Sequence, residues 1–494
     1  MPFLSLPREI HQQIISYLPS NHDVAALSIQ CRTLHTMCDM AARHKYHRII
    51  VSSDEEKLDR AFDLLMDILK CPTLGQYVRC IECWEGTSTN PVYKEIKYQR
   101  DLSTEEMDLV RKAVRKGGFT GPREEPIVNM LMQRIEKAGV DQYGQRDCLG
   151  TFVSQALTAI LIVVSPNLVS MAITPPCGSP STLAELLTGT NADPKNKPYL
   201  RLLRDVYLIN ESKDSWNKDR RFLIEMDFFG CLRLLDNLPS IKTVRTDNVD
   251  VDRNTELDFN ERYSNISRIS IQHSSFDSTS LAALLVSCKV LREFQYSVGG
   301  RGSRDGGIHM FNPKAFFKAA CLHKDTLELL DLDVESQIDL FDISDEEERV
   351  YAINEYGSPY ESGIDDGPRT FLQELWSRGG SLRDFVTLKS LSLGINLLLY
   401  FAKGLDPQPE QKKDSRLVDC LPKSLEHLCV RGYHKGDNPE HDKYMDELLT
   451  LSKVGPSQLK EIEGIEQTIP NAGYRYIRPG WGSALDVAFA GAWG

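Results

Sequence analysis

The chain has 494 residues, of which 41% are hydrophobic and 26% are charged. This composition is typical of a folded globular protein and excludes disordered, collagen-like and disulfide-dense classes. The chain carries 58 Lys and Arg residues against 70 Asp and Glu residues, a net charge of −12. Broad binding to nucleic acid or to an anionic membrane needs a basic surface, so we expect neither as a partner.

Cysteine spacing and hydropathy indicate an intracellular protein. The twelve cysteines are unevenly spaced and suggest no disulfide framework, which favours a reducing compartment. The chain begins without the basic start and apolar run of a secretory signal. Its longest apolar run, Ala156 to Val164, is about half of what a membrane-spanning helix needs, so we expect a buried helix there. We therefore expect a cytoplasmic or nuclear location, or both.

The first predicted element is a helix over residues 6 to 18. Leu6, Ile10, Ile14 and Leu18 recur at four-residue spacing, which places them on one stripe of the helix. Pro7 suits the first position of this helix, where the missing amide proton costs no hydrogen bond. The stripe is apolar along its whole length and therefore has to meet another surface.

Two further helices are predicted in the first fifty residues. One runs over 24–29 with Asp23 as its cap, and the other runs over 31–44. Leu34, Met37, Cys38 and Ala41 are expected on the inner side of the third helix. A core of three short helices is marginal on its own, so docking on a larger body is expected.

The order and spacing of these N-terminal residues carry a resemblance to a known family. The residues concerned are Leu6, Pro7, Glu9, Ile10, Ile14, Tyr17, Leu18, Asp23, Leu27, Cys31, Arg32, Leu34, Tyr46 and Ile49. Together they resemble the F-box, the module by which substrate receptors attach to cullin-based ubiquitin ligases. Two departures occur: Val24 stands where a leucine is usual, and Leu34 or His35 replaces the aromatic that often follows the Cys-Arg pair.

The F-box resemblance implies a partner and a set of contact residues. The partner is a Skp-type adaptor protein, and through it a cullin. The implied adaptor-binding residues are Leu6, Pro7, Ile10, Ile14 and Leu18, whereas Leu27 and Leu34 are expected to be internal. The alternative is that these helices only cap the end of a repeat array, which would also require an amphipathic surface.

A six-residue pattern, apolar-x-x-apolar-x-apolar, recurs from residue 46 to the end of the chain. Its copies span 46–51, 78–83, 168–173, 203–208, 266–271, 291–296, 327–332, 388–393 and 425–430, with weaker copies at 241–244 and 459–462. Helix-like segments precede most copies, at 57–69, 153–164, 222–235, 278–288, 313–322 and 445–451, and further ones are expected at 104–116 and 127–139. The repeating unit is therefore helix, turn and strand, which predicts an α/β fold with parallel strands.

This repeat resembles the divergent leucine-rich repeats found in F-box proteins of fungi and plants. It lacks the Asn or Cys ladder of the regular family, and its step is uneven. The resemblance implies an irregular solenoid with parallel strands on the concave face and helices outside. The alternative is a generic α/β domain. The predicted domains are an F-box-like module at 1–50, a solenoid at 51–470 with loops near 100–150 and 335–385, and a tail at 471–494; an acidic loop is expected at 344–368.

Candidate chemical sites are few. Cys80 and Cys83, with Cys71, His44 and His47, have some of the spacing of a metal site, but an odd offset on a strand sends the first two to opposite faces. The glycine-rich run 299–307 lacks the Lys-Ser/Thr end of a phosphate loop and is interpreted as an inter-repeat loop. No hydrolase, metalloprotease, kinase or dinucleotide motif is present.

These observations predict a non-enzymatic receptor without a metal or another cofactor. In this interpretation the chain is the substrate-recognition subunit of a Skp-cullin-F-box type ubiquitin ligase, and it holds an unknown target protein by protein-protein contacts. The alternative function is a leucine-rich-repeat interaction scaffold without a role in ubiquitination.

Overall fold

The computed structural model describes most of the chain in separate segments. These are residues 5–16, 18, 21–52, 55–84, 100–134, 149–176, 181–210, 222–251, 261–302, 311–338, 379–404, 416–454 and 459–472. They divide into two compact units, one built mainly from residues 5–210 and the other mainly from 222–472, with 233–241 belonging to the first. The predicted acidic loop at 344–368, and the tail from residue 473 onward, lie outside the described residues.

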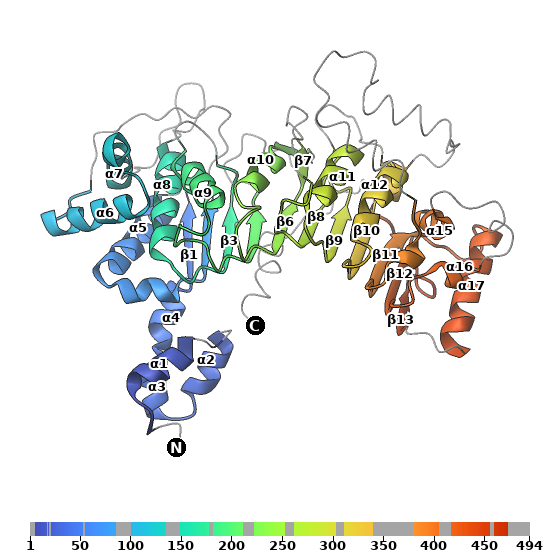
Figure 1. The fold of residues 1–494 in the computed structure, drawn as a ribbon, viewed down its shortest axis with the longest axis horizontal. Coiled ribbons are helices and arrows are strands. Elements are labelled where there is room, and N and C mark those ends of the chain that lie inside the picture. The colour runs from blue at the N-terminus through green and yellow to red at the C-terminus, as the bar shows by residue number, and fades with distance from the viewer. Residues whose placement is uncertain are drawn as a thin grey trace, which may run out of the picture. The chain divides into compact units, whose positions relative to one another are not determined.

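The first unit contains the N-terminal helices and the first four strands (Figure 1). Its elements are α1 (Arg8–Ser16), α2 (Asn21–Ser28), α3 (Arg32–Cys38), α4 (Met40–Tyr46), β1 (Arg48–Ser52), α5 (Glu55–Lys70), η2 (Pro72–Tyr77), β2 (Cys80–Trp84), α6 (Thr104–Lys116), η3 (Gly121–Arg123), α7 (Glu124–Met132), α8 (Leu149–Val164), β3 (Ser170–Ile173), α9 (Thr182–Ala192) and β4 (Asp205–Leu208). Each of the four strands pairs in parallel with the next one along the chain.

The second unit repeats the same arrangement. Its elements are β5 (Ile224–Met226), α10 (Phe228–Arg233), β6 (Thr243–Asp247), β7 (Val249–Val251), β8 (Arg268–Gln272), α11 (Ser278–Ser287), β9 (Glu293–Ser297), α12 (Pro313–Ala320), η4 (Cys321–His323), β10 (Leu329–Asp333), η5 (Glu335–Gln337), η6 (Leu382–Asp384), β11 (Ser390–Gly394), α15 (Ile395–Lys403), α16 (Leu417–Cys420), β12 (His427–Arg431), α17 (Pro439–Val454) and β13 (Glu461–Glu463). Strands β6 and β8 to β13 pair in parallel in chain order, and β5 pairs separately with β7. The predicted α/β class with mostly parallel strands is confirmed.

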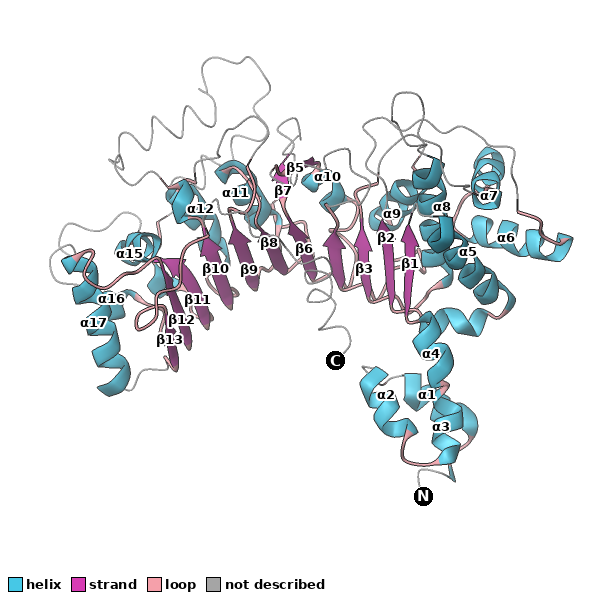
Figure 2. Ribbon diagram, turned by 180° about the vertical axis from the view of Figure 1, so that it is seen from behind, coloured by secondary structure: helices cyan, strands magenta, loops and turns pink. Residues whose placement is uncertain are grey.

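Every copy of the six-residue pattern falls on a strand of the parallel ladders. In the copy on β9, Leu291, Phe294 and Tyr296 occupy the first, fourth and sixth positions and are at most 1% exposed. These positions face the helices, and Figure 2 shows α11, α12 and α15 on one face of β8 to β12. The side chains that alternate with them lie on the other side of the strands, which we call the opposite face. The pattern thus indicates strands that bury one face against the helices and leave the other face outside the core.

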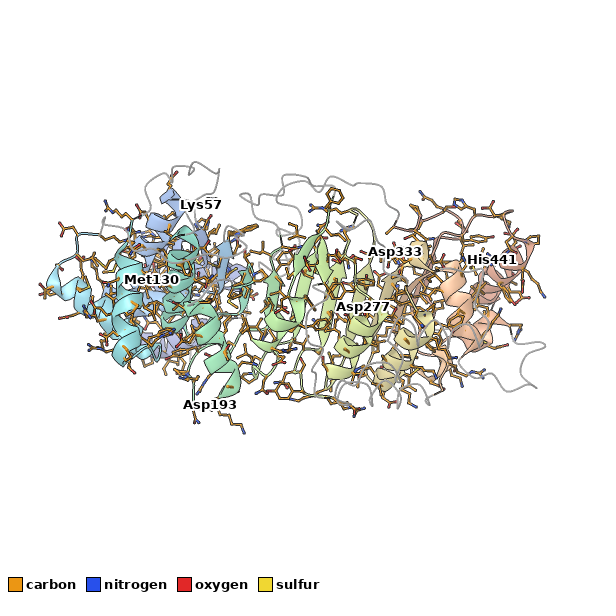
Figure 3. All side chains as sticks on the ribbon, turned by 90° about the horizontal axis from the view of Figure 1, so that it is seen from above. Lys57, Met130, Asp193, Asp277, Asp333 and His441 are labelled. Carbon is orange, nitrogen blue, oxygen red and sulfur yellow. The ribbon has the colours of Figure 1, made fainter. Side chains whose placement is uncertain are left out.

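The predicted helices match closely in most places. The expected helix at 104–116 is α6, which begins with a capping box between Ser103 and Glu106. Asp277, labelled in Figure 3, caps α11 because its carboxylate accepts the Ser280 N–H at 2.8 Å. The apolar run that ends at Val164 is part of α8, whose residues 151–163 are all buried. No described helix is long and apolar enough to cross a membrane.

Three helix predictions are wrong in part. The helix expected at 127–139 is α7, which ends at Met132 because the backbone of Gln133 is extended. The first half of the segment 222–235 is strand β5, because Ile224–Met226 finds a parallel partner in Val249–Val251, and α10 begins only at Phe228. The predicted helix over 31–44 breaks at Asp39, whose φ of 47° is left-handed and cannot continue a helix. The N-terminal region therefore has four helices in place of three, and Ala41, expected inside, is exposed.

Candidate functional site

The N-terminal helices close around a small apolar core. Ile15, Val24 and Cys38 are at most 2% exposed, and four partly buried side chains pack against them: Leu18, Leu27, Met37 and Met40. Leu34 is also buried, as expected. Three fully buried side chains make a small core, so these helices have little apolar burial of their own to hold them together.

Helix α1 turns one side to this core and leaves most of its apolar stripe outside it. The buried residues of α1 are His11 and Ile15. Of the five predicted contact residues, Pro7 is exposed, Ile10 is 40% exposed, and Leu6 and Ile14 are half-buried. Leu18 differs from these four because it packs on the module's own core. Four of the five residues are therefore partly or largely accessible beside one another on and before α1.

Pro7 determines where this helix begins. Its carbonyl oxygen accepts hydrogen bonds from the N–H groups of Ile10 and His11, both at 3.1 Å. Pro7 is therefore the last residue before α1. The helix begins at Arg8, one residue later than predicted. Glu9 lies in the first turn, where its charge is favourable at the positive end of the helix dipole.

The last N-terminal helix is tied directly to the following elements of the first unit. The Tyr46 hydroxyl donates to the Asp67 carboxylate of α5 at 2.7 Å, and the Lys45 ammonium reaches the same carboxylate at 2.8 Å. The Arg43 guanidinium lies 4.8 Å from the ring centroid of Tyr77 in η2. Only one residue separates α4 from β1. Side chains on both sides of α4 therefore fix its direction.

That single residue, His47, is itself part of the connection. It is 6% exposed, and its carbonyl oxygen accepts the N–H groups of Arg79 and Cys80 at 3.0 Å each. Burial, followed by the nearby positive charge of Arg79, lowers the pKa of the imidazole to about 4. The ring is therefore neutral at physiological pH.

The opposite face of the first unit carries a small apolar cluster. Cys80, Ala172 and Ile209 form a buried cluster against which Trp84 and Tyr207 pack. Glu82, which is 1% exposed, lies among these strands and forms an ion pair with Arg48. The Trp84 indole N–H also donates to the Glu82 carboxylate, at 3.1 Å. The carboxylate is thus fully bonded within an apolar surrounding.

The opposite face of the second unit is polar. The Ser297 hydroxyl donates to the Gln272 side-chain oxygen at 2.8 Å, and the Gln272 amide donates to Ser270 at 3.3 Å. Towards β12, the Arg431 guanidinium reaches Asp331 at 2.8 Å and Asp333 at 3.5 Å. These side chains alternate in the sequence with apolar core residues such as Ile271, Tyr296, Leu332 and Val430.

The carboxyl ends of β10 to β12 hold the chain segment that follows β13. The Ala472 N–H donates to both oxygens of Asp333 at 2.9 Å, and Asn471 donates to Glu335 at 3.3 Å. Glu335 also accepts the first N–H groups of α15. Burial raises the pKa of both carboxyl groups despite these bonds. Asp333 is labelled in Figure 3.

At the amino ends of β8 to β13, basic and acidic side chains pair along the ladder. The pairs are Arg268 with Glu293, Arg292 with Glu328, Lys389 with Glu328, His427 with Glu461 and Lys460 with Glu426. Neighbouring strands therefore neutralise each other along this end.

The suspected cysteine and histidine site is not assembled. Cys83 lies in the core with its sulfur 4.0 Å from the Ser154 carbonyl oxygen of α8, whereas Cys80 belongs to the opposite-face cluster. Within the segments that the structure describes, no three His, Cys, Asp or Glu side chains are grouped as metal ligands. Part of the glycine-rich run 299–307 lies outside those segments.

Comparison with known proteins gives no further guidance, because no family model matches the chain and no curated protein matches its sequence.

Sequence reasoning missed the polar groups at the carboxyl ends of β10 to β12. Asp331, Asp333 and Glu335 alternate with apolar residues, a signal that could have placed them on one face. Their partners Arg431 and Ala472 are about a hundred residues or more away in the chain. Only the pairing of the strands brings these groups together.

Proposed function

We propose that this chain is the substrate-recognition subunit of a Skp-cullin-F-box type ubiquitin ligase. In this proposal residues 1–50 are an F-box-like module that binds a Skp-type adaptor, and 51–470 are an irregular leucine-rich-repeat-like solenoid that holds the target. The observation that carries it is the apolar stripe of α1. Leu6, Pro7, Ile10 and Ile14 stay outside the small core of the N-terminal helices, as a helix-in-groove contact requires.

The strand units support the second half of the proposal. Parallel strands follow one another in chain order within each unit, and leucines or other apolar residues recur at the same positions of each strand. A repeated helix-turn-strand unit of this kind buries its core only against its neighbours and presents a long surface of strand side chains. Such a surface suits binding of another protein.

The proposed role in the reaction is one of proximity. The N-terminal module attaches to the ligase, and the strand surface holds the target beside the ubiquitin-loading enzyme. This raises the effective concentration of target lysines, and no residue of this chain takes part in the chemistry. The contacts of Tyr46, Lys45 and Arg43 would keep the direction of α4 constant while a target is bound.

Co-purification with the adaptor tests this proposal. The intact chain should retain a Skp-type adaptor, and Leu6→Asp combined with Ile10→Asp should lose it, because charges would then face an apolar groove. Gln12→Asp is the matched control, since Gln12 is exposed on α1 away from the stripe. Failure of the intact chain to bind the adaptor would sink the proposal and leave the repeat-scaffold function. Retention of the adaptor by the double variant would also contradict it.

A further inference from the structure

Four side chains form one row on the opposite face of the second unit. Asp331 on β10 pairs in register with Ser392 on β11, which pairs with Cys429 on β12, which pairs with Glu463 on β13. Neighbouring strands lie about 4.8 Å apart, so the outer two strands are separated by about 14 Å. We call these four residues the acidic row. Two carboxylates thus flank two small side chains.

The two carboxylates have unused hydrogen-bonding capacity. One oxygen of Asp331 pairs with Arg431 at 2.8 Å, and the side chain is 28% exposed. The other oxygen of Asp331 has no partner in the described part of the chain. Glu463 is exposed and forms no ion pair with any described residue. The row therefore carries more negative charge than the single guanidinium that reaches it.

Ser392 provides an independent indication of a ligand. The residue is only 9% exposed, and its hydroxyl has no hydrogen-bond partner among the described residues. It lies between Asp331 and Cys429 in the ladder, on the same face as both. A buried hydroxyl without a partner is unfavourable, and a water molecule or a bound group that forms a hydrogen bond with it removes that cost. A ligand with several N–H donors would satisfy it together with the carboxylates.

The neighbouring acidic groups are already used by the fold. Asp333 accepts two bonds from the Ala472 N–H, and Glu335 accepts bonds from α15 and from Asn471. The Glu461 carboxylate pairs with His427 at 3.2 Å. The acidic row is thus distinguished from these groups by its free acceptors.

We propose that the acidic row binds an extended segment of the target protein through two basic side chains, arginine above all, one at each carboxylate. A guanidinium presents five donors in a planar fork, which suits a carboxylate and a neighbouring hydroxyl, such as Asp331 and Ser392, better than an ammonium does. The identity of the bound segment as a target rests on the proposed function; the recognition of arginine does not. A different role for Glu463 would be to keep the last strand from pairing with another chain, and the experiment below separates the two.

The test measures binding of a fluorescein-labelled peptide of alternating arginine and serine to the full chain, by fluorescence anisotropy at low ionic strength. Asp331→Asn combined with Glu463→Gln should weaken binding roughly tenfold or more, because two partly exposed charge pairs are lost. The control Asp325→Asn combined with Glu56→Gln removes the same net charge at exposed positions elsewhere. It should leave binding within about twofold.

A second variant tests the same row in the other direction. Arg431→Gln removes the guanidinium that pairs with one oxygen of Asp331. It should therefore tighten binding of the arginine peptide several-fold. Melting followed by circular dichroism checks that each variant is folded. Equal binding by the row variant and the control, or weaker binding by Arg431→Gln with an unchanged melting temperature, would overturn the proposal and leave Glu463 as an edge-protecting charge.

Two further readouts keep this test apart from the proposed function. Leu6→Asp combined with Ile10→Asp should bind the arginine peptide like the unaltered chain. The row variant should retain the adaptor. Peptide binding without adaptor binding would remove the ligase role and keep the acidic row, whereas the reverse result would remove only the acidic row.

Discussion

The N-terminal helices and the strands of the second unit use their apolar residues in different ways. Strands β9 to β12 bury every first, fourth and sixth residue of their pattern, as Leu388, Leu391 and Leu393 do at 0% exposure. The N-terminal helices bury Ile15 yet leave Ile10 40% exposed. The strands thus bury their apolar side chains internally and turn polar groups outward, while α1 leaves part of its apolar stripe accessible, which we propose serves a partner. Two kinds of recognition are expected from one chain.

The largest expected effect comes from the strand core. Leu391→Ala should lower the free energy of unfolding by about 4 kcal/mol, because a fully buried leucine leaves a cavity in a packed core. Ile10→Ala should change it by less than about 0.5 kcal/mol. Urea unfolding of both variants measures the difference. Similar losses in the two would remove the distinction between internal and outward apolar residues.

The junction between the N-terminal helices and the first strand of the first unit should respond to pH. His47 has a folded pKa of about 4 against an unfolded value of 6.5. Protons bind the unfolded chain first, so the stability due to neutral His47 is complete above pH 6.5 and is lost as pH falls towards 4. The loss amounts to about 3 kcal/mol.

Denaturant unfolding across this pH range tests the junction. His47→Asn should flatten the curve between pH 6.5 and 4 relative to the unaltered chain. The substitution His44→Asn, at an exposed position of α4 just before His47, is the control. A parallel shift of the whole curve in His47→Asn, without a change in slope, would show that the imidazole is not buried in its neutral form.

The next largest effect concerns the packing of the turn after β13 against β12. Gly464 has a φ of +85°, and a β-carbon there would lie 1.8 Å from the Val430 carbonyl oxygen. Gly436 has a φ of +99° with no atom within 4 Å of the added carbon. Gly464→Ala should therefore lower the free energy of unfolding by about 2 kcal/mol more than Gly436→Ala does. The Gly436 substitution strains only the backbone conformation. Equal melting temperatures for the two variants would mean that β13 is loosely held.

The smallest effect concerns the tie between α4 and α5. Tyr46→Phe removes the hydroxyl that donates to Asp67 at 2.7 Å and should cost about 1 kcal/mol. Thermal unfolding measures it, with Tyr263→Phe, at an exposed tyrosine of the second unit, as the control. A Tyr46 variant as stable as its control would show that Lys45 alone holds the Asp67 carboxylate.

The sequence predicted the strands well because each copy of the pattern has to bury three residues on one side. It missed β5 and β7, which are three residues each, and it missed α9 and α15. The break in the helix at Asp39 was not predicted because a residue with left-handed backbone angles does not change the spacing of apolar residues. The acidic row could not be predicted from the sequence either, since only the pairing of four strands places Asp331 and Glu463 in one row. In α1 and just before it, Pro7 and Ile10 are exposed and Leu6 and Ile14 are half-buried, whereas Leu18 packs on the core; their contact with an adaptor stays a prediction.

The central claim is that the apolar stripe of α1 serves a partner and not the fold. Calorimetric titration of the full chain with a purified Skp-type adaptor, combined with thermal melting of the same samples, tests it most directly. We predict that Leu6→Asp combined with Ile10→Asp abolishes measurable binding while the melting temperature stays within about 2 °C of the unaltered chain. Adaptor binding equal to that of Gln12→Asp, or a large fall in melting temperature, would contradict the account.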